Sequence, residues 1–301
     1  MAVNLASAYS KSVDERFKLK ALTGSVVNQG IRLKWSGVQT VTVFSVDTVA
    51  ETNYDRAGTT DTNHRYGTVA NLGNTKQDYT LSQDKAFTFA IDGADLTDSQ
   101  FVFEAGAALG RQINEVAIPN TDAYRLSKFA ITAGGALSGT GAGGTGQKVS
   151  QSGTATSASN AYTILLDAGV LLDEAKVPAD GRVAFVSPTF YMFLKLDANF
   201  IKASDLGQKK LITGQIGEVD GVAIVKVPTT YLPKFTSGGN KSVDMILVHK
   251  GVMVSPVKLA NYKTHKNPPG IDGYLVEGRR YYDAFVLEAK KMGVAIHFNP
   301  S

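Results

Sequence analysis

Two neighbouring segments decide the fold of this chain: DGRVAFVSPTFYMFLKL at residues 180–196 and GQIGEVDGVAIVKVP at residues 214–228. In the first segment, an Asp-Gly turn signal precedes a short, mostly apolar run, which predicts a strand over residues 182–186. Ser187-Pro188 then marks the start of a helix, because a serine oxygen accepts a hydrogen bond from a free helix N–H and proline fits the first helical position. We therefore expect a helix over residues 188–196.

The second segment predicts a tight turn followed by a strand. Glycines punctuate the turn at Gly214, Gly217 and Gly221. An apolar strand is expected over residues 222–227, where Pro228 ends it. Glu218 and Asp220 could form an acid pair, but an Asp-Gly step favours a turn for backbone reasons, and we prefer the turn. The two segments together predict a strand–helix–loop–strand unit with no catalytic residue in it.

This pair of segments resembles the central domain of tailed-bacteriophage major capsid proteins with the HK97-like fold. That family shows a strand, a Ser/Thr-Pro helix start and a Gly-x-x-Gly-x-x-x-Gly turn before the next strand. In this chain, the three glycine positions of that turn are similar and are occupied by Gly214, Gly217 and Gly221. The resemblance implies an α+β fold with an N-terminal arm and an extended β-hairpin, the E-loop. It also implies a peripheral domain, in which a long spine helix lies beside an antiparallel sheet, and a mixed α/β axial domain.

The composition is that of an ordinary globular protein. A chain of 301 residues with 43% hydrophobic and 19% charged residues can bury a large core. No apolar run is long enough to span a bilayer, and early charges interrupt any signal-peptide core, so we expect no membrane partner and a cytoplasmic origin. The resemblance implies that this cytoplasm is that of a host bacterium, where the protein would assemble. The absence of cysteine excludes disulfides, cysteine-bound zinc and thiol catalysis.

The N-terminal third predicts an arm and a long hairpin. Residues 12–15, Ser-Val-Asp-Glu, match a capping box, so a short helix is expected to residue 22. Residues 36–92 alternate apolar and polar side chains in two β arms around a polar middle, residues 51–77. One hairpin is marginally stable alone in water, so it needs a partner surface. The residues alone favour a hairpin folded onto its own domain, whereas the resemblance implies an E-loop lying over a neighbouring subunit.

Helical periodicity is strongest after the hairpin. A second capping box at residues 97–100 precedes apolar residues at three- and four-residue spacing from Val102 to Val116. Pro119 is expected to interrupt this helix, with Asn120 or Thr121 capping a continuation to residue 131. Residues 132–159 are almost wholly Gly, Ala, Ser and Thr and predict a flexible loop. Asn160 is expected to cap a further helix over residues 161–176.

The last third predicts strands. Residues 245–248 and 252–254 are expected to pair as a hairpin around Lys250-Gly251. Residues 258–271 are polar and contain two prolines, and residues 274–276, 281–286 and 293–298 are β-rich. With the resemblance, these patterns imply an N-terminal arm (1–35), an E-loop (36–92), a peripheral domain (93–159 and 258–301) and an axial domain (160–257).

The sequence holds no constellation that identifies an enzyme. Its histidines, His64, His249, His265 and His297, are far apart and lack a second ligand at a metal-binding spacing. Residues 139–144 fit a dinucleotide fingerprint and residues 141–148 resemble a phosphate-binding loop. However, the required strand, helix and Gly-Lys-Ser/Thr ending are missing. We expect no enzymatic activity, no cofactor and no metal.

The resemblance implies a structural protein whose copies form pentamers and hexamers of an icosahedral phage head around double-stranded DNA. The net charge of +4 is consistent with DNA contact without sequence readout. No long charged helical region precedes the arm, so a separate scaffolding protein is expected, together with a portal. Subunit contacts are expected at Arg56, Arg65, Lys76, Glu277, Arg279 and Arg280.

Alternatives remain open from the sequence alone. An encapsulin-like compartment would have the same fold but enclose an enzyme cargo, and a β-rich surface protein would need a signal peptide. Glu277, Arg279 and Arg280 could also be a solvated ion cluster. Some relatives of the resembling family form an isopeptide bond between a lysine and an asparagine, for which Lys76 or Lys85 could serve, but no local motif identifies the partners.

Overall fold

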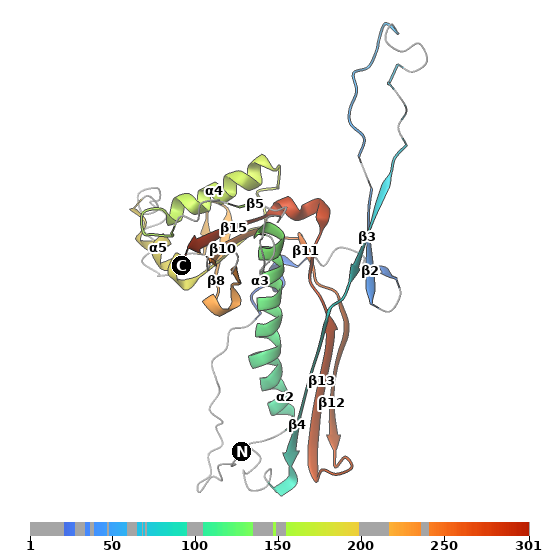
Figure 1. The fold of residues 1–301 in the computed structure, drawn as a ribbon, viewed down its shortest axis with the longest axis vertical. Coiled ribbons are helices and arrows are strands. Elements are labelled where there is room, and N and C mark those ends of the chain that lie inside the picture. Colours follow the sequence, from blue (N-terminus) through green and yellow to red (C-terminus); the bar gives the residue numbers. More distant parts are fainter. Residues whose placement is uncertain are drawn as a thin grey trace. The chain divides into compact units, whose positions relative to one another are not determined.

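The computed structural model describes residues 21–27, 34–36, 39–46, 48–58, 65–67, 69, 71–94, 105–134, 147–148, 155–198, 217–235 and 241–300. The chain forms two compact units (Figure 1). The hairpin unit is Gly30–Gln83, and the main unit is Met1–Gln29 with Asp84–Ser301. The helix predicted for residues 12–22 lies largely outside the described residues, as do the capping box at 97–100, Gly214, His64 and most of the glycine-rich stretch.

The main unit contains a long helix that the sequence predicted in two pieces. It runs as α2 (Ala105–Gln112), the π-helical turn η2 (Ile113–Ala117) and α3 (Ile118–Gly134). The predicted break at Pro119 is wrong, because the turn before it widens: the N–H of Ile118 bonds to the carbonyl of Ile113. A widened turn accommodates a proline ring that would otherwise clash with the carbonyl four residues earlier. Thr121 caps nothing, since its hydroxyl donates to the carbonyl of Ala117.

The predicted strand–helix unit is present with the expected bounds. β6 (Arg182–Val186) leads into α5 (Pro188–Leu196), and β8 (Val222–Lys226) runs parallel to β6. The Ser187 Oγ accepts from the backbone N–H of Phe190 at 3.1 Å. Ser187 is therefore the N-cap and Pro188 the first helical residue, as the sequence predicted.

The turn before β8 is the Asp-Gly turn that the sequence favoured over an acid pair. Asp220 and Gly221 have φ values of 49° and 73°, and they connect β7 (Glu218–Val219) to β8 as an antiparallel hairpin. Two successive positive φ angles are typical of a type I′ turn, which Asp-Gly adopts readily. Asp220 is thus explained by backbone geometry.

Seven strands form the larger sheet among the described residues. Its order is β5-β15-β10-β6-β8-β7, with β9 paired to β10. The remaining strands are β5 (Gln147–Lys148), β9 (Lys234–Phe235), β10 (Lys241–His249) and β15 (Val294–Pro300). β10 lies between β6 and β15 and pairs antiparallel with both. Most residues of these three strands are buried, which explains their continuous apolar runs in the sequence.

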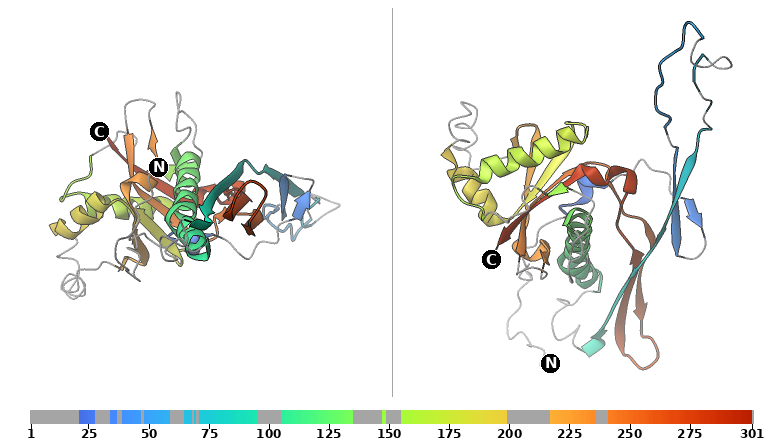
Figure 2. Two further views of the ribbon diagram at one scale, coloured as in Figure 1. Left: turned by 90° about the horizontal axis from the view of Figure 1, so that it is seen from below. Right: turned by 45° about the horizontal axis from the view of Figure 1, so that its top comes forward.

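Helices cover both faces of this sheet (Figures 1 and 2). Val183 and Phe185 of β6 join the buried cluster that contains Leu126 and Phe129 of α3. The alternate residues of β6 join a second cluster with α4 (Ala161–Glu174) and α5. Successive side chains of a strand point to opposite faces, so one strand contributes to both layers of the core. Leu126 and Phe129 of α3 are both fully buried.

The second sheet of the main unit has the order β12-β13-β4. These strands are β4 (Gln83–Asp92), β12 (Val257–Lys266) and β13 (Gly273–Tyr282). On one face, Ile91 and Val276 pack with Ala108 and Leu109 of α2. Gly273 has a φ of 142°, and a Cβ there would lie 2.1 Å from the carbonyl oxygen of Ile91. Only glycine permits this close approach of β13 to β4.

Three strand assignments from the sequence differ from the structure. β4 was expected to be the returning arm of the hairpin, but it pairs with β13, where its apolar residues meet α2. β10 and β11 (Met253–Val254) do not pair with each other; β11 pairs with β14 (Phe285–Val286). β15 was expected in the peripheral sheet beside the long helix; it packs against α3, but it belongs to the larger sheet, next to β10. Alternation predicts a strand but carries no information about its partner.

Short elements complete the main unit. They are the 3-10 helices η1 (Gly24–Val26), η3 (Thr229–Tyr231) and η4 (Glu288–Gly293). Asn160 precedes α4, but its side chain accepts from the N–H of Ser157 and donates to the carbonyl of Ala155. The carboxylate of Asp197 accepts from the N–H of Tyr162 instead, at 3.0 Å. Asn160 is therefore the N-cap residue of α4 as predicted, but its side chain makes no cap hydrogen bond, and Asp197 at the end of α5 binds the start of α4 instead.

The hairpin unit confirms the core of the predicted hairpin. β2 (Thr40–Val46) pairs antiparallel with β3 (Asn74–Thr80), from Thr40↔Thr80 to Val46↔Asn74, and β1 (Lys34–Ser36) adds a third strand. Between β2 and β3 the described residues form no further strand. The unit ends at Gln83, nine residues before the predicted hairpin end at residue 92.

Candidate interaction surfaces

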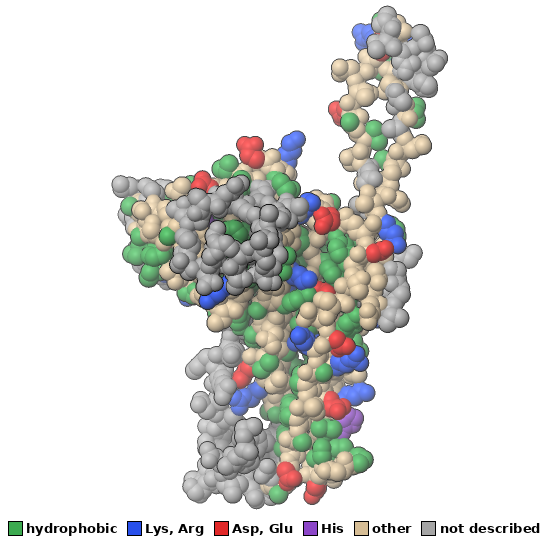
Figure 3. Space-filling view, in the orientation of Figure 1, with side chains coloured by type: hydrophobic (Ala, Val, Ile, Leu, Met, Phe, Trp, Pro, Cys, Tyr) green, Lys and Arg blue, Asp and Glu red, His purple; other side chains and the backbone are tan. Residues whose placement is uncertain are grey.

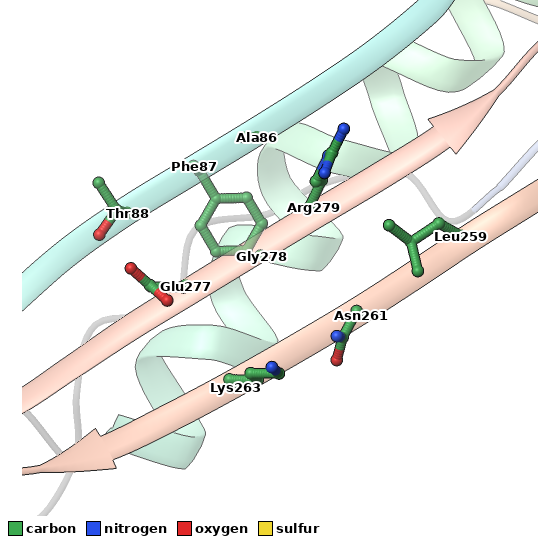
Figure 4. Close-up of a pocket in the computed structure, with 9 residues that line it drawn as sticks. All are labelled: Ala86, Phe87, Thr88, Leu259, Asn261, Lys263, Glu277, Gly278 and Arg279. Carbon is green, nitrogen blue, oxygen red and sulfur yellow. The ribbon is translucent and has the colours of Figure 1, made fainter.

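The three-stranded sheet presents a polar outer face on the side away from α2. Glu277 and Arg279 of β13 are exposed, whereas Val276 and Gly278 between them are buried. Figure 4 shows residues of all three strands in this region, with the helix behind the sheet. In the space-filling view, basic and acidic side chains alternate along the outside of these strands (Figure 3). The outer face is therefore charged but of mixed sign.

A groove of about 590 Å³ crosses this outer face. It is lined by Ala86, Phe87, Thr88, Leu259, Asn261, Lys263, Glu277, Gly278 and Arg279. Gly278 has its side-chain direction on the opposite face, where a Cβ would lie 2.4 Å from the ring of Phe87 and 2.9 Å from that of Tyr262, so glycine leaves room there for the two rings. Phe87 also stacks on Tyr262, with ring centroids 6.2 Å apart. The lining of the groove is therefore mixed: Phe87 and Leu259 are apolar, whereas Lys263, Glu277 and Arg279 are charged.

One ion pair and one histidine–carboxylate contact involve the predicted contact residues of this face. The guanidinium of Arg279 donates two hydrogen bonds to the carboxylate of Asp84. Nε lies 3.0 Å from Oδ1, and Nη2 lies 2.6 Å from Oδ2. This hydrogen bonding lowers the pKa of Asp84 and raises the pKa of Arg279. His265 Nε2 lies 3.4 Å from Glu277 Oε2. All four side chains are exposed or nearly so, so the pairs orient the surface more than they stabilise the fold.

Arg280 does not belong to this cluster, although it adjoins Arg279 in the sequence. Its side chain points to the opposite face of β13, where Nη1 donates to Thr121 Oγ1 of α3 at 3.0 Å. The guanidinium also lies 5.3 Å from the ring centre of Tyr282. The sequence grouped Glu277, Arg279 and Arg280 together, but strand alternation separates them.

A buried carboxylate fixes the segment around η1 to the long helix. Asp122 is 2% exposed and accepts from the N–H of Leu22 at 2.8 Å, the N–H of Thr23 at 3.4 Å and the hydroxyl of Thr23 at 2.6 Å. Arg125, one turn further along α3, also donates to the Thr23 hydroxyl. Sequence reasoning missed this anchor, because its partners are about 100 residues apart.

The hairpin unit carries a set of apolar side chains with little cover. Those on the connection between β2 and β3 are Val49, Tyr54, Tyr66, Val69 and Leu72, and each is at least half exposed. Tyr54 and Tyr66 contact each other edge to face, with centroids 4.9 Å apart. The sequence reading called this region polar and gave these residues no role. Exposed apolar side chains concentrated on one connection indicate a surface that a partner covers.

The three predicted contact residues of the hairpin unit lie on its surface. Arg56 and Arg65 are exposed on the connection, and the carbonyl of Arg65 accepts from the N–H of Asp55. Lys76 on β3 pairs with Asp78 at 2.8 Å. Hydrogen bonds from Lys76 and then Thr42 lower the pKa of Asp78. These residues are placed where a neighbour can reach them, but whether they touch one remains a prediction.

Other kinds of site find little support in the described part of the chain. There, no group of three His, Asp or Glu side chains is arranged to hold a metal ion. No described helix has both the length and the apolar character needed to cross a bilayer. The groove on the outer face and the hairpin connection are the candidate interaction surfaces among the described residues.

The comparisons with known proteins agree on the fold. The model of a phage capsid protein family matches residues 80–296. A structure of Mycobacterium phage Che8 has a TM-score of 0.70 and 18% identity, covering 97% of this chain and 96% of that one. The capsid of Cyanophage P-SCSP1u has a TM-score of 0.67 and 18% identity, covering 98% and 93%. The acidic stable capsid of Helicobacter pylori bacteriophage KHP30 has a TM-score of 0.64 and 12% identity, covering 99% and 96%.

No curated protein matches the sequence. The similar structures are far below 25% identity, so they bear on the fold alone. With them, the HK97-like α+β fold predicted from the sequence is confirmed.

Proposed function

Because the chain belongs to the phage capsid protein family, we propose that it is the major capsid protein of an icosahedral phage head. It is a structural protein of the virion, and its copies contact one another. The observation that carries the mechanism is the hairpin unit, whose connection exposes Val49, Tyr54, Tyr66, Val69 and Leu72. Covering such side chains with a neighbouring copy removes apolar surface from water and stabilises the contact.

The finer features of assembly belong to the same proposal. Copies group as pentamers and hexamers, because closed shells need repeated contacts between identical surfaces. A separate scaffolding protein and a portal take part in assembly in the cytoplasm of the host bacterium. The shell encloses double-stranded DNA and contacts it weakly and without sequence readout, with which the modest net charge of +4 is consistent. The protein has no catalytic role and needs no cofactor.

The hairpin provides the direct test. Residues 47–73 lie beyond the last β2–β3 pair, Val46↔Asn74, so an Asn-Gly turn can replace them without disturbing the strands. We expect this variant to fold, with an unchanged circular dichroism spectrum, and to form no shells in electron micrographs. A second variant, Tyr54→Ser with Tyr66→Ser, keeps the chain length and should assemble poorly. Normal shells from the shortened variant would contradict the assigned role of the hairpin.

A further inference from the structure

A small pocket lies on the face of β13 opposite Glu277 and Arg279. It measures about 240 Å³ and is formed by α3, β12, β13 and Ala21. Apolar groups of Ile118, Val257 and Ala260 line it together with Tyr282. The polar groups in it are Thr121, Asp122, Arg125 and Arg280. Val257 and Ala260 are exposed, whereas Asp122 and Tyr282 are buried, so the pocket has an open apolar side and a polar floor.

The two guanidinium groups in the pocket lack a carboxylate partner of their own. Within the described ranges, no Asp or Glu oxygen lies within 4.0 Å of Arg125 or Arg280. Arg125 instead donates to the hydroxyls of Ser255 and Thr23, and burial lowers the pKa of Arg125. Asp122 is the one acid here, and its oxygens already accept from Leu22 and Thr23.

Arg280 has N–H donors that make no hydrogen bond to the described residues. A guanidinium has five N–H donors, and the described residues engage one nitrogen of Arg280, through Thr121. The guanidinium carbon of Arg280 also lies over the ring of Tyr282, 5.3 Å from its centre. A planar guanidinium with unused donors is suited to bidentate binding of a carboxylate.

We propose that this pocket receives the carboxylate of an acidic side chain from a second copy of the chain. The volume suits one side chain and falls below the range typical of pockets for free small molecules. The apolar side matches the methylene stem of such a residue, and the two arginines match its head. Arg125 and Arg280 are both partly buried beside apolar side chains, and arginines in such surroundings are common at the centres of protein interfaces. The inference rests on the proposed function, because it assumes that copies of this chain bind one another.

The contact can be trapped chemically in the assembled protein. In an Arg280→Lys variant, a carbodiimide would join the new amine to a carboxylate held in the pocket. Shells assembled from equal amounts of ¹⁵N-labelled and unlabelled chains would reveal whether the joined peptides come from two copies. We expect mixed heavy–light peptides that contain one specific Asp or Glu. Absence of a product, or products from within single copies alone, would overturn the proposal.

A matched control uses the neighbouring residue on the same strand. Arg279 lies on the other face and binds Asp84 of its own chain, so Arg279→Lys should give a product with Asp84 within one copy. This control shows that the reaction works in the shell and that the mass analysis distinguishes the two cases.

Assembly itself gives a second readout. Arg280→Gln removes one charge-assisted contact, so we expect association between copies to weaken about 10- to 100-fold, with Arg279→Gln near wild type. If Arg280→Gln assembles normally but retains less DNA, the anion is a phosphate and the proposal fails. If wild-type chains form no shells with any scaffold, the proposed function is wrong, and this inference, which depends on it, is wrong as well. If all three proteins form shells equally well, the inference alone fails.

Discussion

Removing the Asp122 carboxylate should be among the most damaging single changes in the main unit. Asp122→Ala leaves the N–H groups of Leu22 and Thr23 without their acceptor inside the protein and takes the nearby negative charge from Arg125. Hydrogen bonds to a charged group contribute about 1.5 to 3 kcal/mol each. Two of the three distances are short and one is 3.4 Å, so we expect a loss of about 3 to 5 kcal/mol in the free energy of unfolding.

Urea unfolding of the unassembled chain, followed by circular dichroism, measures this loss. Asp167 is an exposed acid on α4, so Asp167→Ala is the matched control and should change stability by less than about 0.5 kcal/mol. Thr23→Val removes the hydroxyl that binds Asp122, and the double variant should show a coupling of about 1 to 3 kcal/mol. A cost below about 1 kcal/mol for Asp122→Ala, or no coupling to Thr23, would refute the assigned anchor.

Three further changes test other parts of the fold. Ser187→Ala removes the N-cap of α5 and should cost about 1 kcal/mol in urea unfolding, so an unchanged midpoint would contradict the cap. Gly278→Ala should cost about 1 to 3 kcal/mol by pressing on Phe87, whereas Gly110→Ala in open space on α2 should stabilise by up to about 1 kcal/mol. Equal changes in stability for Gly278→Ala and Gly110→Ala would contradict this reasoning. Burial raises the pKa of Asp244, so wild-type stability should fall as pH rises from about 4 through that raised pKa. Asp244→Asn should abolish this fall, and an unchanged pH profile would argue against it.

The parts that the sequence predicted well are those specified by local chemistry. The Ser187-Pro188 helix start, the Asp220-Gly221 turn and the apolar runs of β6 and β8 each contain their own structural signal. Such signals act within a few residues, so they can be read without knowing the fold.

The errors share a physical cause. β12 was missed because nearly all its residues are exposed, and a strand without a buried face has no alternation to detect. β4 and β15 were recognised as β-rich but assigned to the wrong partners, because pairing depends on residues far away in the sequence. The Pro119 break failed because the π-helical turn before it is a tertiary adjustment that propensity does not describe.

The candidate contact residues show that the alternation of side chains along a strand predicts which face a residue lies on, but not which distant residue it contacts. Glu277 and Arg279 are two apart and Arg280 is adjacent, so the sequence contained the signal that separates them on a strand. The pairing of Arg279 with Asp84, 195 residues away, and the pocket around Arg280 required the folded chain. The division into arm, hairpin, peripheral and axial domains remains a prediction beyond the two compact units.

Electron microscopy of the purified chain, alone and with candidate scaffolding proteins, tests the central claim most directly. We predict closed icosahedral shells, or rings of five and six copies, with masses from light scattering that are multiples of 32.0 kDa. A chain that stays monomeric at high concentration with every candidate scaffold would contradict the claim that it builds a phage head.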